Sequence, residues 1–352
     1  MKILKLELEN IRNFSRLDMD FGDLTIIYGS NAQGKTNLLE AIYYLTLTKS
    51  SRKGRENDII QKGRKEGRIK GIFQTENQGD LEIEFILGPQ KIGKINGAKT
   101  KLKDILGQAE TVFFTVDDLE IIESPQKRRR FLNVFISLLD KKYFLNLLEY
   151  QQSLKRRNKT LSLLKYQKSS RGEINFWDEK LASLGTEIIK KRKETILRIN
   201  NLLKSSPLFF TKNPLCLKYN PKNITKETLL KELQDNLEKD IILEQTTIGP
   251  HRDIIKFEAD SLDLEIFGSR GEKRTAVIEL KMAEIELTQQ EKNIIPILLL
   301  DDIFSELDNK NKANALQLIQ KQQTIITAIN PEQIRTKLKN AKVYKLENGE
   351  IR

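Results

Sequence analysis

The chain has 352 residues, 38% hydrophobic and 31% charged, so it is long enough to bury one large core or two ordinary ones. One cysteine, Cys216, excludes an internal disulfide and suits a reducing cytoplasm, and one histidine, His251, leaves no Cys/His metal cluster. The 61 Lys and Arg residues against 49 Asp and Glu give a net charge of +12, which favours a polyanionic partner. Because no apolar stretch approaches the ~18 residues of a membrane span, we expect a cytoplasmic protein with no membrane partner.

The N-terminal part of the chain carries both strand and helix patterns. Residues 4–8 and 81–87 alternate apolar and charged side chains, which predicts half-buried strands. Asn96-Gly97 is a strong hairpin-turn signal. Between these strands, residues 37–47 repeat apolar side chains at helical spacing. This segment is therefore predicted to be mixed α/β.

The middle of the chain changes to long amphipathic helices. Residues 126–166 and 174–203 repeat apolar positions at intervals of three and four, with few glycines. Beyond about residue 245 strands are again expected, at 254–257 and 262–266, followed by a helix at 274–288.

The last 60 residues again alternate strand and helix. The continuous apolar run at 297–300 predicts a buried parallel strand. We expect a helix at 311–321, a strand at 325–329, and a final strand at 343–346 followed by the Asn348-Gly349 turn. The simplest organisation is an α/β domain formed by residues 1–120 and 245–352, with a mostly helical lobe, 121–244, inserted between them.

The strongest motif matches G-x-x-x-x-G-K-[ST], the phosphate-binding P-loop, and consists of Gly29, Ser30, Asn31, Ala32, Gln33, Gly34, Lys35 and Thr36. A predicted strand precedes it and a helix follows, so backbone N–H groups and a helix N-terminus would converge on the phosphates. Lys35 would reach the β- and γ-phosphates of the nucleotide, and the Thr36 hydroxyl would ligate Mg²⁺. The alternative is an ordinary glycine-rich turn between a strand and a helix.

The second half of such a site is a carboxylate at the end of an apolar strand. Asp301 and Asp302 follow the run at 297–300. We expect Asp301 to hold Mg²⁺ directly or through water, and Asp302 to orient or deprotonate the attacking water. The alternative is that both residues only cap the helix that follows.

Two further segments are similar to those of ABC-type ATPases. Residues 305–308, Ser-Glu-Leu-Asp, stand where these ATPases carry the D-loop, which includes Asp308. Upstream, Ser269, Arg270, Gly271 and Glu272 resemble the ABC signature, whose N–H and hydroxyl donors close over the γ-phosphate held by the other subunit of a dimer. A polar loop before a helix is the alternative for this second segment.

Strings along nearly the whole chain match one known family: residues 8–14, 31–42, 124–125, 128–132, 177–178, 181–182, 247–253, 268–269 and 300–308. With these strings the chain resembles the RecF family of bacterial recombination-repair ATPases nearly from end to end. Gly-Pro-His-Arg-Asp at 249–253 and Asp-Asp-Ile-Phe-Ser-Glu-Leu-Asp at 301–308 are far more specific than the P-loop.

The resemblance implies an α/β fold, an ABC-type P-loop ATPase head with mixed β-sheets and an inserted, mostly helical lobe. It implies ATP and Mg²⁺ as cofactors, with Arg12, Asn13, Asn37 and Asp308 contributing to the nucleotide site, and a weak DNA-stimulated ATPase activity. It also implies an ATP-dependent homodimer on double-stranded and gapped DNA that acts with RecR and RecO to place RecA. The protein would then be cytoplasmic and associated with the nucleoid.

The chain departs from the family pattern at three places. Arg270 and Glu272 replace the two glutamines of the usual signature, and Glu272 adds a negative charge near the expected γ-phosphate. Residues 113–119 lack the expected Pro-Glu pair, so no Q-loop glutamine is assigned. Thr327 stands where transporter ATPases have a switch histidine, and His251 is expected to be a structural or interface residue.

DNA is expected to meet clusters of basic residues. Residues 49–70 hold nine basic residues against three acidic ones, and residues 155–171 hold seven basic residues and no acidic one. Aromatic residues are sparse among them, which favours contacts to a duplex backbone over stacking on single strands. The DNA-binding candidates are Arg52, Lys53, Arg55, Arg64, Lys65, Lys155, Arg156, Arg157 and Lys159. Each cluster could instead be a solvated helix face.

Other classes of protein fit the sequence less well. The nucleotide subunit of a membrane transporter would carry a Leu-Ser-Gly-Gly-Gln signature and a switch histidine, and a chromosome-organising head would need long heptad arms. The remaining alternative is another head ATPase similar to the chromosome-maintenance (SMC) proteins, acting as a nucleotide-gated switch with little hydrolysis.

Overall fold

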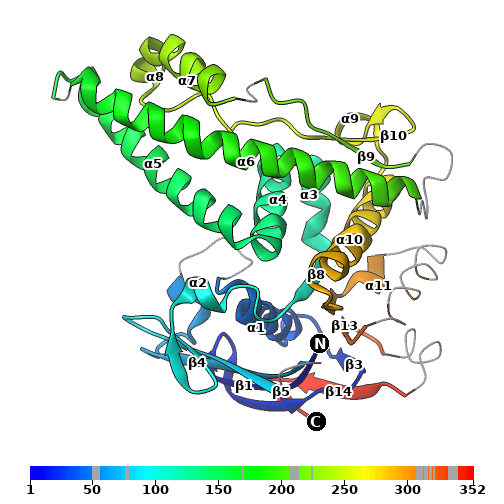
Figure 1. Ribbon diagram of the computed structural model, residues 1–352. Helices are drawn as coiled ribbons and strands as arrows, with labels where there is room; N and C mark the ends of the chain where they lie inside the picture. Colours follow the sequence, from blue (N-terminus) through cyan, green and yellow to red (C-terminus); the bar gives the residue numbers. More distant parts are fainter. Residues whose placement is uncertain are drawn as a thin grey trace. The chain divides into compact units, whose positions relative to one another are not determined.

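The structure is a computed structural model that describes residues 1–49, 56–75, 79–168, 170–205, 214–222, 225–306, 322–331 and 340–352, with Lys312, Leu316 and Ile319. The chain folds into two compact units (Figure 1). The first unit combines Met1–Asp118 with Glu284–Arg352, and the second comprises Leu119–Ala283. Among the described residues, no helix is both long and apolar enough to span a membrane.

An antiparallel sheet forms one layer of the first unit. Within the described residues its strand order is β2-β1-β4-β5-β6-β7. The strands are β1 (Lys2–Ile11), β2 (Phe14–Asp20), β4 (Gly67–Thr75), β5 (Gly79–Leu87), β6 (Ile92–Ile95) and β7 (Ala98–Thr100). The strands expected at 4–8 and 81–87 are confirmed, and so is the Asn96-Gly97 hairpin turn, where both residues have positive φ. Two short helices, η1 (Glu56–Ile59) and α2 (Leu102–Ile105), flank this sheet in sequence.

The second sheet of this unit is mostly parallel, in the order β15-β14-β3-β13-β12-β8 among the described residues. Its members are β3 (Leu24–Tyr28), β8 (Thr111–Thr115), β12 (Ile297–Asp301), β13 (Thr324–Ala328), β14 (Lys342–Glu347) and the antiparallel edge strand β15 (Glu350–Ile351). The strands predicted at 297–300, 325–329 and 343–346 are confirmed. Because β3, β12 and β13 run parallel, their carboxyl ends meet at one edge of the sheet.

Helix α1 (Lys35–Leu47) joins the two sheets into one core. Its residues Leu38, Leu39 and Ile42 are fully buried, in one cluster with Phe85 of the antiparallel sheet and Leu299 of the parallel sheet. The helix predicted at 37–47 is thus confirmed, and its N-terminus follows the P-loop directly. The burial of α1 on both sides therefore fixes where the P-loop ends.

The second unit is mainly helical. It contains α3 (Glu120–Glu123), α4 (Pro125–Leu139), α5 (Lys141–Lys165), α6 (Arg171–Ser205), α7 (Lys226–Asp235), α8 (Leu237–Leu243) and α9 (Leu264–Phe267). The long helices α5 and α6 pack side by side (Figure 1). A small sheet of β9 (Cys216–Lys218), β10 (Lys256–Ala259) and β11 (Leu262–Asp263) completes the unit. The predicted α/β fold with a helical insertion is confirmed.

Three expectations differ from the structure or fall outside it. The strand predicted at 262–266 is shorter, because the Asp263 carboxylate accepts from the Glu265 backbone N–H at 3.0 Å and starts α9. Residues 245–283 were expected in the α/β domain but belong to the helical unit, where β10 pairs with β9. The helix expected at 311–321 lies outside the described residues apart from its three described positions.

The boundary between the units falls within a helix. Helix α10 (Arg270–Lys292) begins in the second unit and ends in the first, so the helix expected at 274–288 is confirmed and is longer than predicted. Two short elements border the parallel strands in sequence, η2 (Val116–Leu119) after β8 and α11 (Ile303–Glu306) after β12.

Candidate nucleotide-binding site

The P-loop lies between the end of β3 and the start of α1, and two of its glycines are required by close contacts. A Cβ on Gly29 would lie 2.3 Å from the carbonyl oxygen of Leu346, and a Cβ on Gly34 would lie 2.3 Å from the side chain of Asn13. Gly34 also has a φ of +103°, which side chains disfavour. The two glycines therefore allow the tight backbone turn that phosphate binding needs.

Asparagine side chains hold this turn in place. Asn13 donates to the carbonyl oxygen of Gln33 at 2.8 Å, and Asn37 donates to Asn13 Oδ1 at 2.9 Å. From the C-terminal hairpin, the Asn348 backbone N–H donates to Gln33 Oε1 at 2.6 Å. Asn13 and Asn37 thus lie at the predicted site, whereas Asn348 was missed because 315 residues separate it from Gln33.

The Arg12 guanidinium lies in a neighbouring ion pair. Its Nη2 lies 3.2 Å from Glu40 of α1, and its Nη1 donates to the carbonyl oxygen of Asp58 at 2.7 Å. Its Nε is buried without a hydrogen-bond partner among the described residues. Arg12 therefore supports the turn from the side of α1, and its contact with nucleotide stays a prediction.

Lys35 is bound to the P-loop itself. Its Nζ donates to the carbonyl oxygens of Gly29 at 2.6 Å and Ser30 at 2.9 Å. Burial lowers the pKa of the Lys35 ammonium, while the charges of Asp302 and Asp301 oppose that shift. Two neutral carbonyls hold this cation less strongly than phosphate oxygens would, so the ammonium is suited to move onto a nucleotide.

Asp301 and Asp302 end β12 at the same edge of the sheet as the P-loop. Asp301 is 8% exposed, and its Oδ1 accepts from the Thr327 hydroxyl at 2.6 Å. Asp302 has a φ of +50°, in the left-handed region, and its N–H donates to Thr327 Oγ1 at 3.0 Å. Both residues are therefore held by hydrogen bonds to the neighbouring strand β13. The alternative that they only cap the following helix does not explain these bonds.

The donor set suits a magnesium–ATP complex. The Thr36 hydroxyl at the start of α1 and the Asp301 carboxylate at the end of β12 are oxygen ligands, which Mg²⁺ prefers. Lys35 and the glycine turn supply the charge and the N–H donors that phosphates need. The residues present fit the cofactors that the sequence predicts.

The signature segment begins α10 and forms a reciprocal cap. Ser269 N and Oγ donate to Glu272 Oε2 at 2.8 and 2.7 Å, and the Glu272 N–H donates to Ser269 Oγ at 3.3 Å. These bonds lower the pKa of the Glu272 carboxyl. The four residues 269–272 are exposed. Asp308 of the D-loop lies outside the described residues.

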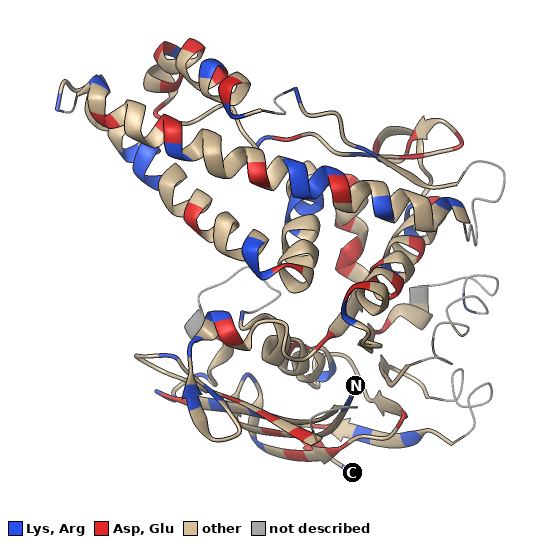
Figure 2. Cartoon of the chain, viewed as in Figure 1, with Lys and Arg blue, Asp and Glu red and all other residues tan. Residues whose placement is uncertain are grey.

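The basic residues of α5 divide between two faces of the helix. Lys155, Arg156 and Lys159 are exposed, whereas Arg157 is fully buried. Figure 2 shows in blue where Lys and Arg residues lie along α5 and α6. Arg64 and Lys65 in the first unit are also exposed, and Arg52, Lys53 and Arg55 lie outside the described residues.

Arg157 must be removed from the DNA-binding set. Its Nε and Nη1 lie 2.6 Å from carboxylate oxygens of Asp178 and Asp240, and Nη1 also donates to Thr246 Oγ1 at 3.0 Å. Successive helical residues point about 100° apart, so this member of the basic run faces the interior and cannot meet a phosphate. Charge counting alone could not separate it from its neighbours.

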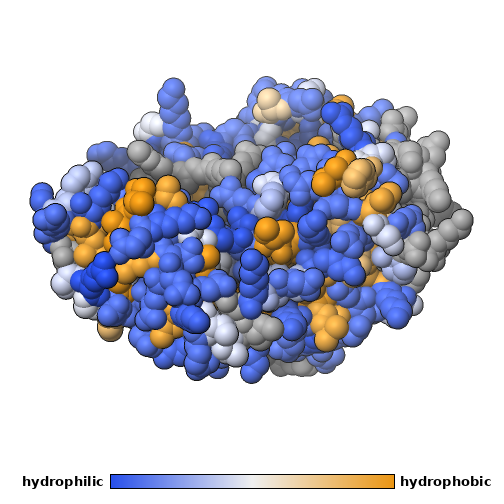
Figure 3. All heavy atoms as spheres, turned by 90° about the horizontal axis from the view of Figure 1, so that it is seen from above, coloured by the Kyte–Doolittle hydropathy of each residue, from blue (hydrophilic) through white to orange (hydrophobic). Residues whose placement is uncertain are grey.

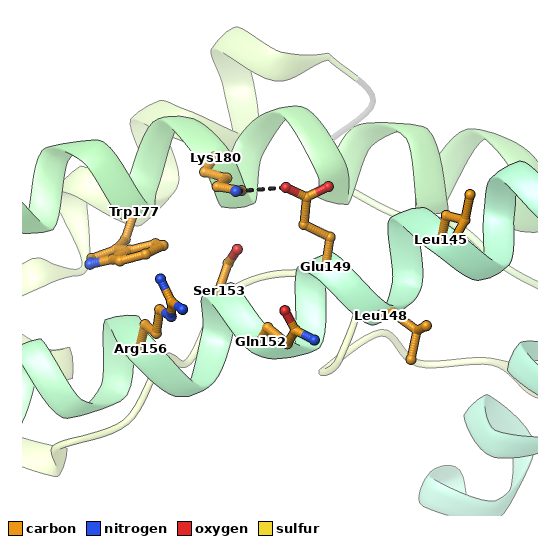
Figure 4. A pocket seen from close by; sticks show the side chains of 8 residues that line it. All are labelled: Leu145, Leu148, Glu149, Gln152, Ser153, Arg156, Trp177 and Lys180. Atoms are coloured by element: carbon orange, nitrogen blue, oxygen red, sulfur yellow. Dashed lines mark ion pairs between the residues drawn. The ribbon is translucent and has the colours of Figure 1, made fainter. Parts of the chain in front are cut away.

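Arg156 borders a pocket between α5 and α6 of about 460 Å³ (Figure 4). The guanidinium lies 5.5 Å from the centre of the Trp177 ring, and the Glu149–Lys180 ion pair, at 2.6 Å, crosses between the two helices. Aromatic residues are sparse in the sequence around this cluster, because Trp177 lies one helix later in the chain. On the face of the molecule that Figure 3 shows, hydrophobic side chains form separate areas among hydrophilic ones.

His251 was expected to be a structural or an interface residue, and its hydrogen bonds within the second unit are those of a structural residue. Its Nδ1 lies 2.8 Å from the Tyr150 hydroxyl and its Nε2 lies 3.0 Å from the carbonyl oxygen of Thr246. Burial lowers the pKa of His251 to about 4, so the ring is neutral at pH 7. The neutral ring therefore bridges α5 and the segment before β10.

The chain is similar to known proteins along its whole length. A protein-family model described as the RecF/RecN/SMC N terminal domain matches residues 2–352. The DNA replication and repair protein RecF of Agathobacter rectalis is 35% identical, covering 100% of this chain and 99% of that protein. The protein of the same name from Staphylococcus carnosus is 35% identical over the full length of both.

Solved structures agree. A structure described as the recombination mediator protein RecF-ATP in the RecFOR pathway is 31% identical, with a TM-score of 0.91, covering 100% of this chain and 97% of that one. The Smc head domain of Pyrococcus furiosus, at 19% identity and a TM-score of 0.55, shares the fold. These likenesses favour the RecF interpretation over another SMC-like head. The chain belongs to the RecF family of DNA replication and repair proteins.

Proposed function

We propose that this chain is an ATP-dependent DNA-binding protein of recombinational repair, in which ATP drives dimerisation on duplex DNA near single-strand gaps. The observation that carries the proposal is the arrangement at one edge of the parallel sheet. There, Lys35 lies on a preformed P-loop turn, and Asp301 and Asp302 end the strand β12. Relatives with RecF names and a RecF-ATP structure of the same fold support it.

The roles of the site residues follow from their chemistry. Lys35 neutralises the β- and γ-phosphates, Thr36 and Asp301 hold Mg²⁺, and Asp302 orients or deprotonates the attacking water. Bound Mg²⁺ would supply the charge that stabilises the phosphates during hydrolysis. Hydrolysis is slow and DNA-stimulated, and it releases the dimer.

The dimer is inferred from the signature segment. Ser269 precedes the 23-residue helix α10 and Gly271 lies in its first turn, and both residues are exposed. A nucleotide held by a second copy of the chain can therefore reach this helix N-terminus, where it would take the Ser269 donors from Glu272. We assign the same partners as in the RecFOR pathway named for the similar structure, namely RecO and RecR, with RecA loaded as the outcome.

Binding to a gapped duplex at near-physiological salt, with ATP or ADP and with the mass recorded by light scattering, tests the whole proposal. We expect tight binding and a dimer mass with ATP, and weak binding and a monomer mass with ADP. Binding that ignores the nucleotide, with the mass fixed as monomer, would leave a phosphate site but remove this mechanism.

The exposed cluster Lys155, Arg156 and Lys159 is proposed as a contact to the DNA backbone. Replacing all three by Gln should weaken binding and reduce the slope of log K against log[salt] by about 2 to 3, because each lost phosphate contact contributes about 0.9. Lys204, Lys231 and Lys239 are exposed residues of the same unit, and replacing them by Gln is the matched control. An unchanged slope in the first variant would exclude the cluster as a DNA contact.

A further inference from the structure

Thr327 on β13 stands where a switch histidine is absent, and its side chain is fully buried. In the parallel pairing of β12 with β13, it lies directly opposite Asp301. The register therefore places the Thr327 hydroxyl beside Asp301, the last residue of β12, which Asp302 follows directly.

The bonds of this hydroxyl have a fixed direction. Thr327 Oγ1 lies 2.6 Å from Asp301 Oδ1, and the carbonyl oxygen of Leu300 is a more distant acceptor at 3.5 Å. A hydroxyl carries a single proton, so it donates to the Asp301 carboxylate. Its lone pair then accepts from the Asp302 N–H at 3.0 Å. The Thr327 hydroxyl thus donates a hydrogen bond to Asp301 and accepts one from the next residue, Asp302.

Asp302 needs such support because of its backbone conformation. Its φ of +50° lies in the left-handed region, which a residue with a side chain keeps only when its surroundings hold it there. The Asp302 N–H is shared between Thr327 Oγ1 and the carbonyl oxygen of Thr327, at 3.0 and 3.2 Å. Both acceptors belong to one residue, so Thr327 sets the direction in which Asp302 leaves the strand.

We propose that Thr327 is a positioning residue that fixes Asp301 for magnesium binding and Asp302 for its work on the attacking water. It acts through these two acidic residues. The inference rests on the proposed function, because it assigns the roles of Asp301 and Asp302 from it. It goes beyond that function by giving a role to Thr327, of which the sequence showed only that it stands where transporter ATPases have a histidine.

The test compares Thr327→Val, which keeps the shape and removes the hydroxyl, with Thr327→Ser, which keeps the hydroxyl. The control is Thr324→Val, because Thr324 is equally buried on the same strand, and its hydroxyl donates to the carbonyl oxygen of Gln322 at 3.2 Å. We expect Thr327→Val to lower kcat about 10- to 100-fold and to raise the Mg²⁺ concentration for half-maximal ATP binding by a similar factor. Thr327→Ser should stay within about threefold of the parent protein, and so should Thr324→Val.

A third readout is independent of nucleotide. Hydrogen exchange at the Asp302 amide should become about tenfold faster or more in Thr327→Val and should be unchanged in Thr324→Val. Unchanged exchange in Thr327→Val, or a parent-like kcat and Mg²⁺ dependence in that variant, would overturn the inference. Failure of the parent protein itself to bind ATP would instead overturn the proposed function, and the exchange measurement would still decide whether Thr327 holds Asp302.

Discussion

The P-loop edge of the first unit and the interior of the second unit both contain buried charged side chains, but different groups satisfy the charge. In the second unit, Arg157 is bonded to two buried carboxylates, and Arg192 to Asp253 at 2.9 Å and to the carbonyl oxygen of Pro250 at 2.7 Å. In the first unit, Lys35 lies on two carbonyl oxygens of its own loop.

The difference separates a structural use of charge from a functional one. A buried ion pair with complete partners contributes little net stability, yet removing one partner is costly because the other charge stays buried. A cation held by neutral carbonyls has no such fixed counterion, so a phosphate can take their place. Arg128 shows the structural pattern again, since it is fully buried and forms an ion pair with the Glu265 carboxylate.

The largest effect is expected at Arg157. Replacing it with Met leaves Asp178 and Asp240 buried without their partner, and should lower the free energy of unfolding by about 3 to 5 kcal/mol. Urea denaturation measures it. The adjacent Arg156→Met, which loses only an exposed charge and its position over Trp177, should cost about 1 kcal/mol or less. Equal losses in the two variants would contradict the division of α5 into a buried and an exposed face.

At Lys35 we expect a loss of ATP binding without a loss of stability. Replacing it with Ala should weaken ATP binding about 10- to 150-fold, because charge-assisted bonds to the phosphates are lost. The free energy of unfolding should not fall, since burial already disfavours the ammonium and lowers its pKa. Titration with a fluorescent ATP analogue and urea denaturation measure the two quantities. Lys99→Ala, at an exposed position of β7 in the same unit, is the control. A loss of stability in Lys35→Ala without a loss of ATP binding would reverse the comparison.

His251 predicts a pH dependence of the second unit. Its pKa is about 4 in the folded protein and near 6.5 when unfolded, so between these values the unfolded chain binds more protons. The His251 contribution to stability is complete above pH 6.5 and declines as the pH falls toward 4. Between pH 7 and 4.5 we expect the parent protein to lose about 2 to 3 kcal/mol more than His251→Gln, which keeps an N–H donor but does not titrate. Parallel pH profiles of urea denaturation would show that this ring is not buried as a neutral group.

The smallest effect concerns Glu272. Its carboxylate accepts from Ser269, so the charge lies beside the donors that are proposed to meet a γ-phosphate. Glu272→Gln keeps an acceptor for the cap and removes the charge, and should lower the ATP concentration for half-maximal dimerisation about two- to fivefold. Glu286→Gln removes the same charge further along α10 and is the control. An increase in the ATP requirement would mean that the carboxylate itself assists the dimer.

The sequence by itself determined most of the helices and strands, and within the site it determined the P-loop and the two acidic residues. Apolar periodicity located α1, α5, α6 and the parallel strands, because strand and helix periods are local properties of the chain. The P-loop and the two acidic residues Asp301 and Asp302 were also found, since each is a contiguous string with a chemical requirement at every position. The family likewise follows from such strings, confirmed by relatives aligned over the whole chain.

Only the tertiary structure decided which charges are functional and what holds them. Lys155 and Arg157 are both basic residues of one run in the sequence. Only packing shows that Lys155 is exposed to solvent and that Arg157 is bonded to Asp178 and Asp240. Thr327 and Asp301 are 26 residues apart, and a parallel register makes them neighbours. Burial and hydrogen bonding between distant segments depend on how the elements assemble, which no local pattern encodes.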